Sequence, residues 1–138
     1  MSFTRPIQVL TLEAAKKLAE AAEAEARKRG WAVAVAVVSP EGSLILFHAI
    51  DGTQPGSTDI AVRKARTAAR LRRPTKALED GLAAGRHALL TIPGAVGLEG
   101  GVPVAIGGQV AGAIGVSGMT SVEDGVVAAA ALAALGDR

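Results

Sequence analysis

The sequence has no cysteine, two histidines, one tryptophan, two phenylalanines and no tyrosine. The lack of cysteine excludes disulfides, thiolate nucleophiles, iron–sulfur clusters and cysteine-ligated zinc. Two histidines are too few for a zinc site with three histidine ligands. Because only 2% of the residues are aromatic, the core must consist of Ala, Val, Leu and Ile, whose small side chains bury little area each. We therefore expect contacts between subunits to bury additional surface.

The chain also lacks a long hydrophobic run and a strong charge. Its longest apolar stretch, residues 125–135, is too short for a bilayer, which needs about 20 residues. The N-terminal MSFTRPIQVL has no signal-peptide pattern, so we expect a cytoplasmic protein without a membrane partner. A net charge of +2 does not indicate nucleic acid as a partner, and no aromatic residues are placed for base stacking.

Hydrophobic periodicity predicts one domain, residues 1–138, with eight elements in the order α-β-β-α-α-β-β-α. Two short connections make antiparallel hairpins, which together form a central antiparallel sheet flanked by helices, an α+β fold. Thr11, Ser57, Thr75 and Thr120 or Ser121 are predicted to cap the helices, with Glu123 and Asp124 at capping-box distance from the last cap. Strands are expected at 31–39, 43–50, 102–106 and 110–117, and helices at 11–29, 57–73, 75–85 and from 120 onward.

Lys64 is the one charged residue in the middle of the apolar stripe of helix 57–73. It either extends past its neighbours to water or sits in a pocket with a partner. Burial without a partner favours a neutral amine that acts as a base or a Schiff-base nucleophile, whereas an anionic partner makes it a fixed cation. Four arginines share another face and suit solvent, a subunit contact or an anion: Arg63, Arg66, Arg70 and Arg73.

Three further polar residues lie near this helix in the chain. Asp51 is most simply a turn residue, but a contact with Lys64 is geometrically possible. His48 shares a strand face with Leu44, Leu46 and Ile50, which suggests a packed histidine or, alternatively, an axial haem ligand. His87 stands in an irregular segment and is a candidate for ligation or proton transfer.

The segment GGQVAGAIGVSG, residues 107–118, is a hairpin turn followed by a strand. Ser117 is not a nucleophile elbow, because Met119 stands where that motif requires glycine. By alternation, Ala111, Ala113, Gly115 and Ser117 share one face, and all are small. Such a face accepts a closely packed helix, a neighbouring subunit or a flat ligand.

Three segments together resemble the GlcG/HbpS family of haem-binding or haem-degrading-like proteins. The same domain is found at the C-terminus of PduO-type cobalamin adenosyltransferases. They are VAVVSPEGSLILFHAIDGT (35–53), the pattern SxDIAxRKARTAA (57–69) and GGVPVAIGGQVAGAIGVSG (100–118). The resemblance implies a profilin-like fold and a homo-oligomer, an octamer or a smaller even assembly. It also implies haem or a related tetrapyrrole as ligand. Haem-binding members use a histidine near the first helix, where this chain has none, so either His48 or His87 replaces it as the axial ligand or the ligand is a different compound.

The resemblance carries over to particular positions. Lys64 matches the lysine of the family's KA-x-TA motif, and Asp51 belongs to its DG pair. Gly100, Gly101, Gly115, Ser117 and Gly118 match its glycine-rich hairpin. Three functions remain open: a module that binds haem or another carboxylated cofactor, an enzyme for a small carbonyl or carboxylate compound, and a structural or regulatory oligomer with the arginine face at a subunit contact. In the enzyme, Lys64 would be base, nucleophile or anion anchor, with Asp51 orienting it.

Overall fold

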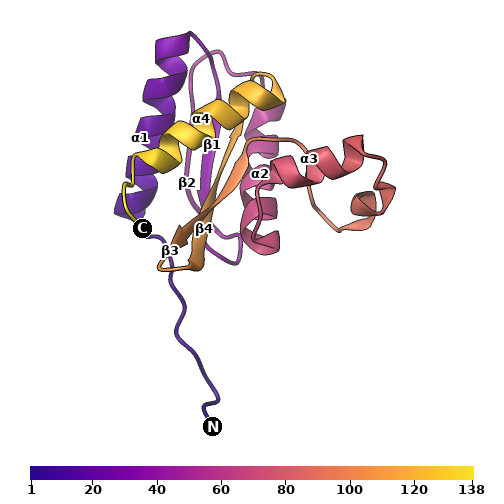
Figure 1. Ribbon diagram of the computed structural model, residues 1–138. Helices are drawn as coiled ribbons and strands as arrows, with labels where there is room; N and C mark the ends of the chain where they lie inside the picture. The colour runs from indigo at the N-terminus through magenta and orange to yellow at the C-terminus, as the bar shows by residue number, and fades with distance from the viewer.

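A four-stranded antiparallel sheet forms the centre of the molecule, with helices on both of its faces (Figure 1). The computed structural model describes all residues, Met1–Arg138. The strand order is β2-β1-β4-β3, so the two predicted hairpins lie side by side through β1 and β4. The strands are β1 (Ala34–Val38), β2 (Leu44–Ala49), β3 (Gly101–Ile106) and β4 (Gln109–Ser117). This arrangement confirms the predicted α+β fold.

The alternation of Val and Ala in β1 sets which residue meets which helical layer. Val33, Val35 and Val37 belong to the larger hydrophobic cluster. Ala34 and Ala36 belong to a second, Ala-rich cluster on the opposite face. Successive side chains of a strand point to opposite faces, and β1 lies between β2 and β4. The predicted division of this strand is therefore confirmed.

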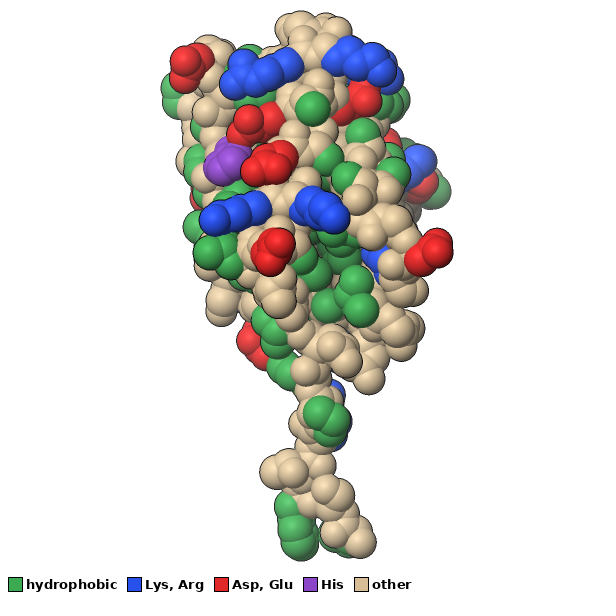
Figure 2. Space-filling view, turned by 90° about the vertical axis from the view of Figure 1, so that its left-hand side faces the viewer, with side chains coloured by type: hydrophobic (Ala, Val, Ile, Leu, Met, Phe, Trp, Pro, Cys, Tyr) green, Lys and Arg blue, Asp and Glu red, His purple; other side chains and the backbone are tan.

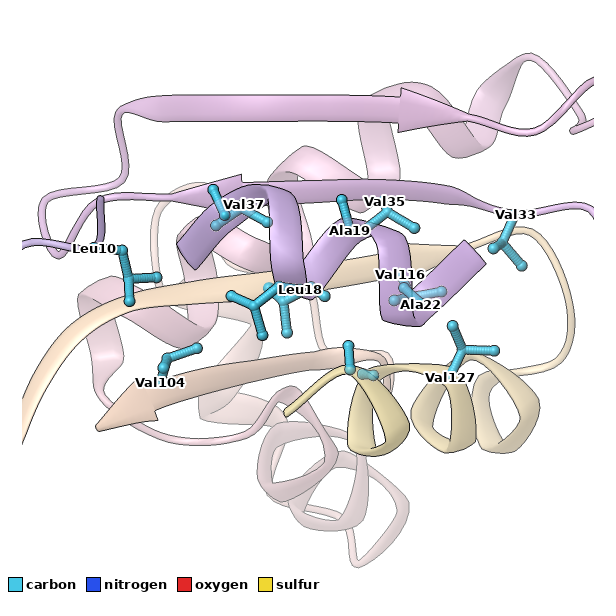
Figure 3. Close-up of a cluster of buried hydrophobic side chains, with 14 of the residues drawn as sticks. Leu10, Leu18, Ala19, Ala22, Val33, Val35, Val37, Val104, Val116 and Val127 are labelled. Atoms are coloured by element: carbon cyan, nitrogen blue, oxygen red, sulfur yellow. The ribbon is translucent and has the colours of Figure 1, made fainter. Parts of the chain in front are cut away.

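The face that carries the valines is covered by two helices, α1 (Leu12–Arg29) and α4 (Ser121–Ala133). Figure 3 shows side chains from both helices and from the sheet meeting in this cluster. Thr11 caps α1 through the Ala14 N–H at 3.1 Å. Thr120 and Glu123 form a complete capping box at the start of α4. Both predicted caps are confirmed, and they fix where each helix begins.

The opposite face is covered by α2 (Gly56–Leu71), which packs on β1, β3 and β4. The short helix α3 (Thr75–Ala83) and the 3-10 turn η1 (His87–Thr91) project beside it, away from the sheet (Figure 1). The helices and strands follow the predicted order. The segment before β3, which periodicity did not resolve, contains η1.

Two predicted helix caps are wrong. Ser57 is the second residue of α2, is buried, and its Oγ accepts the Gln54 Nε2 donor at 3.0 Å. Thr75 is the first residue of α3, and its Oγ1 accepts the Gly101 N–H at 2.9 Å. Both hydroxyls therefore bind partners outside their own helix, which local sequence does not reveal.

A bulge in the second hairpin changes the face of one residue. Val104 pairs with Gly112 and Ala105 with Val110, so Ala111 has no partner in β3. Ala111 packs in the larger cluster, on the α1 and α4 side, whereas Ala113 packs against α2. The predicted common face of Ala111 and Ala113 is wrong, because an extra residue in a strand reverses the alternation.

The first nine residues form an extended arm that leaves the body of the molecule (Figures 1 and 2). Leu10 ends the arm, and its N–H donates to the Ala111 carbonyl at 2.9 Å. The arm carries exposed apolar side chains, among them Phe3 and Ile7. No helix in the structure combines the length and the apolar character needed to cross a bilayer.

Candidate functional site

Lys64 lies on the sheet-facing side of α2, where its exposure is only 2%. Its Nζ donates to the Val116 carbonyl at 3.0 Å and to Asp124 Oδ2 at 3.0 Å. Ala61, Ala65 and Ala68 of the same helix are also buried. Both acceptors come from distant parts of the chain, so the predicted alternative in which this lysine reaches water is wrong.

Asp124 supplies the charge partner from the first turn of α4 and is also buried. Its second oxygen, Oδ1, accepts the Met119 N–H at 2.9 Å. Burial raises the pKa of the Asp124 carboxyl, while the Met119 N–H and the nearby Lys64 ammonium act in the opposite direction. Burial of a charge is tolerated in proteins when the charge is paired and hydrogen-bonded. Together the two residues join α2 to α4.

The glycines predicted for a ligand site enclose this ion pair instead. A Cβ on Gly100 would lie 2.5 Å from the Val116 carbonyl oxygen and 2.9 Å from Lys64 Nζ. A Cβ on Gly101 would meet the Lys64 carbonyl and, at 2.8 Å, Thr75 Cγ2. A side chain at either position would therefore displace the lysine or its helix.

Gly115 shows what presses against the small-residue face of β4. A Cβ there would collide with the Ala61 carbonyl and lie 2.5 Å from the Ala65 nitrogen. The backbone of α2 thus contacts the strand directly, and close helix packing occupies this face. Ser117 is buried at the end of the same strand, and a Cβ on Gly118 would lie 2.5 Å from the Ala32 carbonyl oxygen.

The predicted contact between Asp51 and Lys64 is wrong. Asp51 is exposed in the turn after β2 and forms no ion pair. Lys64 instead points toward the end of β4, where Asp124 is the acid within reach. With both hydrogen bonds made to protein groups and the side chain buried, Lys64 is not placed to attack a substrate.

The sequence pattern around Asp124 indicates a buried acid, although capping rules alone assign this residue to the start of the helix. Asp124 precedes Val127, Ala128 and Ala131 at helical spacing, and all four are buried on one side of α4. Glu123 alone completes the capping box. Asp124 is therefore a lone acid in an apolar stripe, the counterpart of the lone Lys64. Two such opposite charges are expected to pair, because each is costly to bury alone.

His48 lies on β2, paired with Val35 of β1, and contacts α1 through an acidic residue. Its Nδ1 forms a hydrogen bond with Glu23 Oε1. The side chains of His48 and Glu23 are 38% and 28% exposed. Figure 2 shows a histidine beside acidic side chains on the face that α1 forms. Since Glu23 engages Nδ1, the other ring nitrogen, Nε2, has no partner within the chain.

His87 lies in a different environment. It is the first residue of η1 and is exposed, and its backbone N–H donates to the Gly85 carbonyl at 2.9 Å. Its ring forms no side-chain hydrogen bond or ion pair. The two histidines therefore belong to separate parts of the fold, and only His48 has a carboxylate that orients its ring.

The arginine face of α2 is partly used within the chain. Arg66 Nε donates to the Gly42 carbonyl at 2.9 Å, and Arg70 Nε donates to the Glu41 carbonyl at 2.8 Å. Both contacts hold the turn between β1 and β2 against α2. Arg63 pairs with Asp59 on its own helix. Arg66 and Arg70 thus stabilise the fold of a single subunit.

These features define an α+β protein with an antiparallel sheet between helical layers and a buried lysine–aspartate pair that joins the layers. A family model described as haem degrading protein HbpS-like matches residues 10–133, and the chain belongs to this HbpS-like family. Protein GlcG of Escherichia coli K12 is 42% identical over 109 residues, which is 79% of this chain and 81% of GlcG.

Solved structures give the same assignment. A double mutant of Streptomyces reticuli HbpS is 40% identical, with a TM-score of 0.90 over 99% of this chain and 93% of that one. A complex of PduOC with haem is 25% identical, with a TM-score of 0.84 over 93% of this chain and 96% of that one. The resemblance inferred from the sequence motifs is therefore confirmed.

Proposed function

We propose that this protein binds haem or a related tetrapyrrole, with His48 as the axial ligand. The observation that carries the proposal is the hydrogen bond between His48 Nδ1 and Glu23. Histidines that ligate metals usually donate their second ring N–H to a carboxylate or carbonyl, which fixes the ring and its tautomer. Nε2 of His48 is then the ligating atom.

The side of the molecule that carries His48 offers apolar and basic side chains, to which the apolar face and the acids of a tetrapyrrole would bind. Leu46 and Ile50 share the sheet face of His48 and are half-buried. Leu44 does not, because a bulge pairs it with Val38, which packs on the α2 side, so the predicted common face of His48 and Leu44 is wrong. Lysine and arginine side chains lie on the same side of the molecule (Figure 2). When bound, haem would supply an iron that takes an imidazole and propionates that pair with cations.

Comparison with relatives supports this proposal over an enzyme that uses Lys64. The matching family model carries haem in its description, and PduOC has been solved with haem. Lys64 forms a buried ion pair with Asp124, and the glycines around it pack against this pair and leave no cavity for a substrate. A binding function is therefore compatible with a buried Lys64, whereas an enzyme that uses Lys64 would have to open this ion pair.

Titration with haemin tests the proposal. The wild type is expected to shift the Soret band and to saturate near one haem per subunit. His48→Ala should abolish the shift, whereas His87→Ala, the matched control, should retain it. No saturable shift, or a shift lost with His87→Ala and kept with His48→Ala, would contradict the assignment.

We also propose that the protein forms an even-numbered homo-oligomer, an octamer or a smaller assembly. The support is the N-terminal arm, where Phe3 is 92% exposed and Ile7 and Val9 are exposed beside it. Apolar side chains on an extended segment gain free energy when a neighbouring subunit covers them. Sedimentation velocity should show a smaller species for Phe3→Ser/Ile7→Ser, and no change for Leu90→Ser, an exposed apolar residue of η1. An unchanged assembly in the double variant would contradict a role for the arm.

A further inference from the structure

A polar groove lies between the N-terminal arm, the two hairpin turns and the end of α2. Its volume is about 540 Å³, within the range of about 300–1,000 Å³ that is usual for small-molecule sites. The arm contributes Arg5 and Gln8, and the turn between β1 and β2 contributes Glu41. Arg72 follows α2, and Gln109 begins β4. The groove contains neither His48 nor Glu23, so it is separate from the proposed haem ligand.

The side chains of this groove suit a polar anion. The guanidinium groups of Arg5 and Arg72 make no hydrogen bond or ion pair within the chain, unlike that of Arg70, which binds the Glu41 carbonyl. A guanidinium group is well matched to a carboxylate or phosphate, which it binds through two parallel hydrogen bonds. The glutamines add amide donors and acceptors. Only three of the ten lining residues are hydrophobic, so the groove does not suit the apolar face of a tetrapyrrole.

The backbone conformation of Arg72 is a second indication of a binding site. This residue adopts the left-handed conformation, with φ 54° and ψ 43°, and is the one non-glycine residue of the chain with a positive φ. Its N–H caps α2 by donating to the Ala68 carbonyl. Glycine or asparagine is usual at such a position, and another residue is strained there. Strain of this kind concentrates at functional sites, and here it places an arginine on the wall of the groove.

We propose that this groove binds a small hydroxylated anion, with its carboxylate or phosphate between Arg5 and Arg72. Hydroxyl groups of the ligand bind Gln8, Gln109 and the Glu41 carboxylate. Sugar acids and sugar phosphates are the compounds with this chemistry. The ligand site is independent of the haem proposal, because it uses different residues at a different place in the fold.

Chemical-shift perturbation in ¹⁵N–¹H spectra tests this proposal on the intact protein. Gluconate and glucose 6-phosphate are the probes, and glucose is the neutral control. Either anion should move the Gly108 and Gln109 amide signals saturably, and glucose should not. The anion that saturates the signals at the lower concentration shows whether the groove prefers a carboxylate or a phosphate.

Two variants separate recognition by Arg72 from general charge. Arg72→Asn removes the guanidinium but tolerates the left-handed backbone, so it should fold and bind the anions about tenfold more weakly or worse. Arg73→Asn is the matched control, because Arg73 is exposed, contacts the Leu71 carbonyl and does not line the groove. It should bind as the wild type does.

Three results would overturn the proposal. The first is that neither anion moves the groove signals, and the second is that glucose moves them equally. The third is that Arg72→Asn binds as well as Arg73→Asn. If the Gly108 and Gln109 signals change with protein concentration and not with either probe, a second copy covers the groove and the proposal is wrong.

Discussion

Lys64 Nζ lies 3.0 Å from Asp124 Oδ2, and both side chains are buried. The lysine belongs to α2 and the aspartate to α4, which pack on opposite faces of the sheet. The ion pair therefore connects the two helical layers past the end of β4. Gly100 leaves the space that the lysine needs, because a Cβ there would lie 2.9 Å from Nζ.

Removing one partner of this pair should be strongly destabilising. Lys64→Met leaves the Asp124 carboxylate buried without its cation, which typically costs about 3–5 kcal/mol. Urea unfolding followed by the fluorescence of Trp31, the single tryptophan, measures the loss. The double variant Lys64→Met/Asp124→Leu should lose less than the sum of the two single variants, because it leaves no unpaired charge.

The exposed pair of Lys76 and Asp80 provides the control. These side chains are 55% and 61% exposed and lie one turn apart on α3. Lys76→Met should change the stability little, because solvent screens exposed ion pairs. If Lys64→Met is as mild as Lys76→Met, the buried pair does not hold the layers together.

The Asp124 carboxyl should titrate above the ordinary aspartate value of 3.8, because burial raises its pKa. At pH values between 3.8 and this raised pKa, the folded state binds the proton more tightly than the unfolded chain does. The contribution of this group to the free energy of unfolding therefore falls as the pH rises through that window. Carboxyl ¹³C NMR measures the pKa directly, and Asp124→Asn should remove this part of the pH dependence. A value at or below 3.8 would contradict the dominance of burial.

Gly115→Ala should push α2 away from β4. The added methyl group would meet the Ala61 carbonyl and the Ala65 nitrogen, both backbone atoms that move only with the helix. Overpacking of this kind costs about 1–3 kcal/mol or more, measured by urea unfolding. Gly56→Ala is the control, because a Cβ there meets nothing within 4 Å. Equal stability of the two variants would show that α2 adjusts freely.

Glu23→Gln should weaken haemin binding while His48 remains in place. The carboxylate that engages His48 Nδ1 would be lost, and such partners typically contribute about tenfold or more to metal affinity. Glu25→Gln is the matched control on the same helix, since Glu25 pairs with Arg29 instead. Equal affinities of the two variants would remove Glu23 from the site, even if His48 proves to be the ligand.

The two hairpins, the helices and their order followed from local patterns. Alternating Val and Ala in β1 predicted two different buried faces, and both faces exist. Thr11 and Thr120 predicted helix starts because their caps depend only on residues within the first turn. Ser57 and Thr75 did not obey the same rule, since Gln54 and Gly101 bind their hydroxyls.

The candidate site was predictable only in part. The sequence singled out Lys64 and His48 as polar residues on apolar faces, and both proved to have specific partners. It did not identify those partners, because Glu23 and Asp124 lie 25 and 60 residues away along the chain. Only the packing of α1 against β2, and of α2 and α4 on opposite faces, brings them together.

The sequence by itself determined the elements, the small-residue core and the family, because these depend on short-range periodicity and on motifs read along the chain. The tertiary structure decided what the unusual residues do. It buried Lys64 against Asp124, and it placed the glycines where α2 and the Lys64 side chain come too close to the backbone for a Cβ. It also brought Arg5 and Arg72 to one groove. Contacts between distant residues follow from how whole layers pack, and no local pattern encodes that.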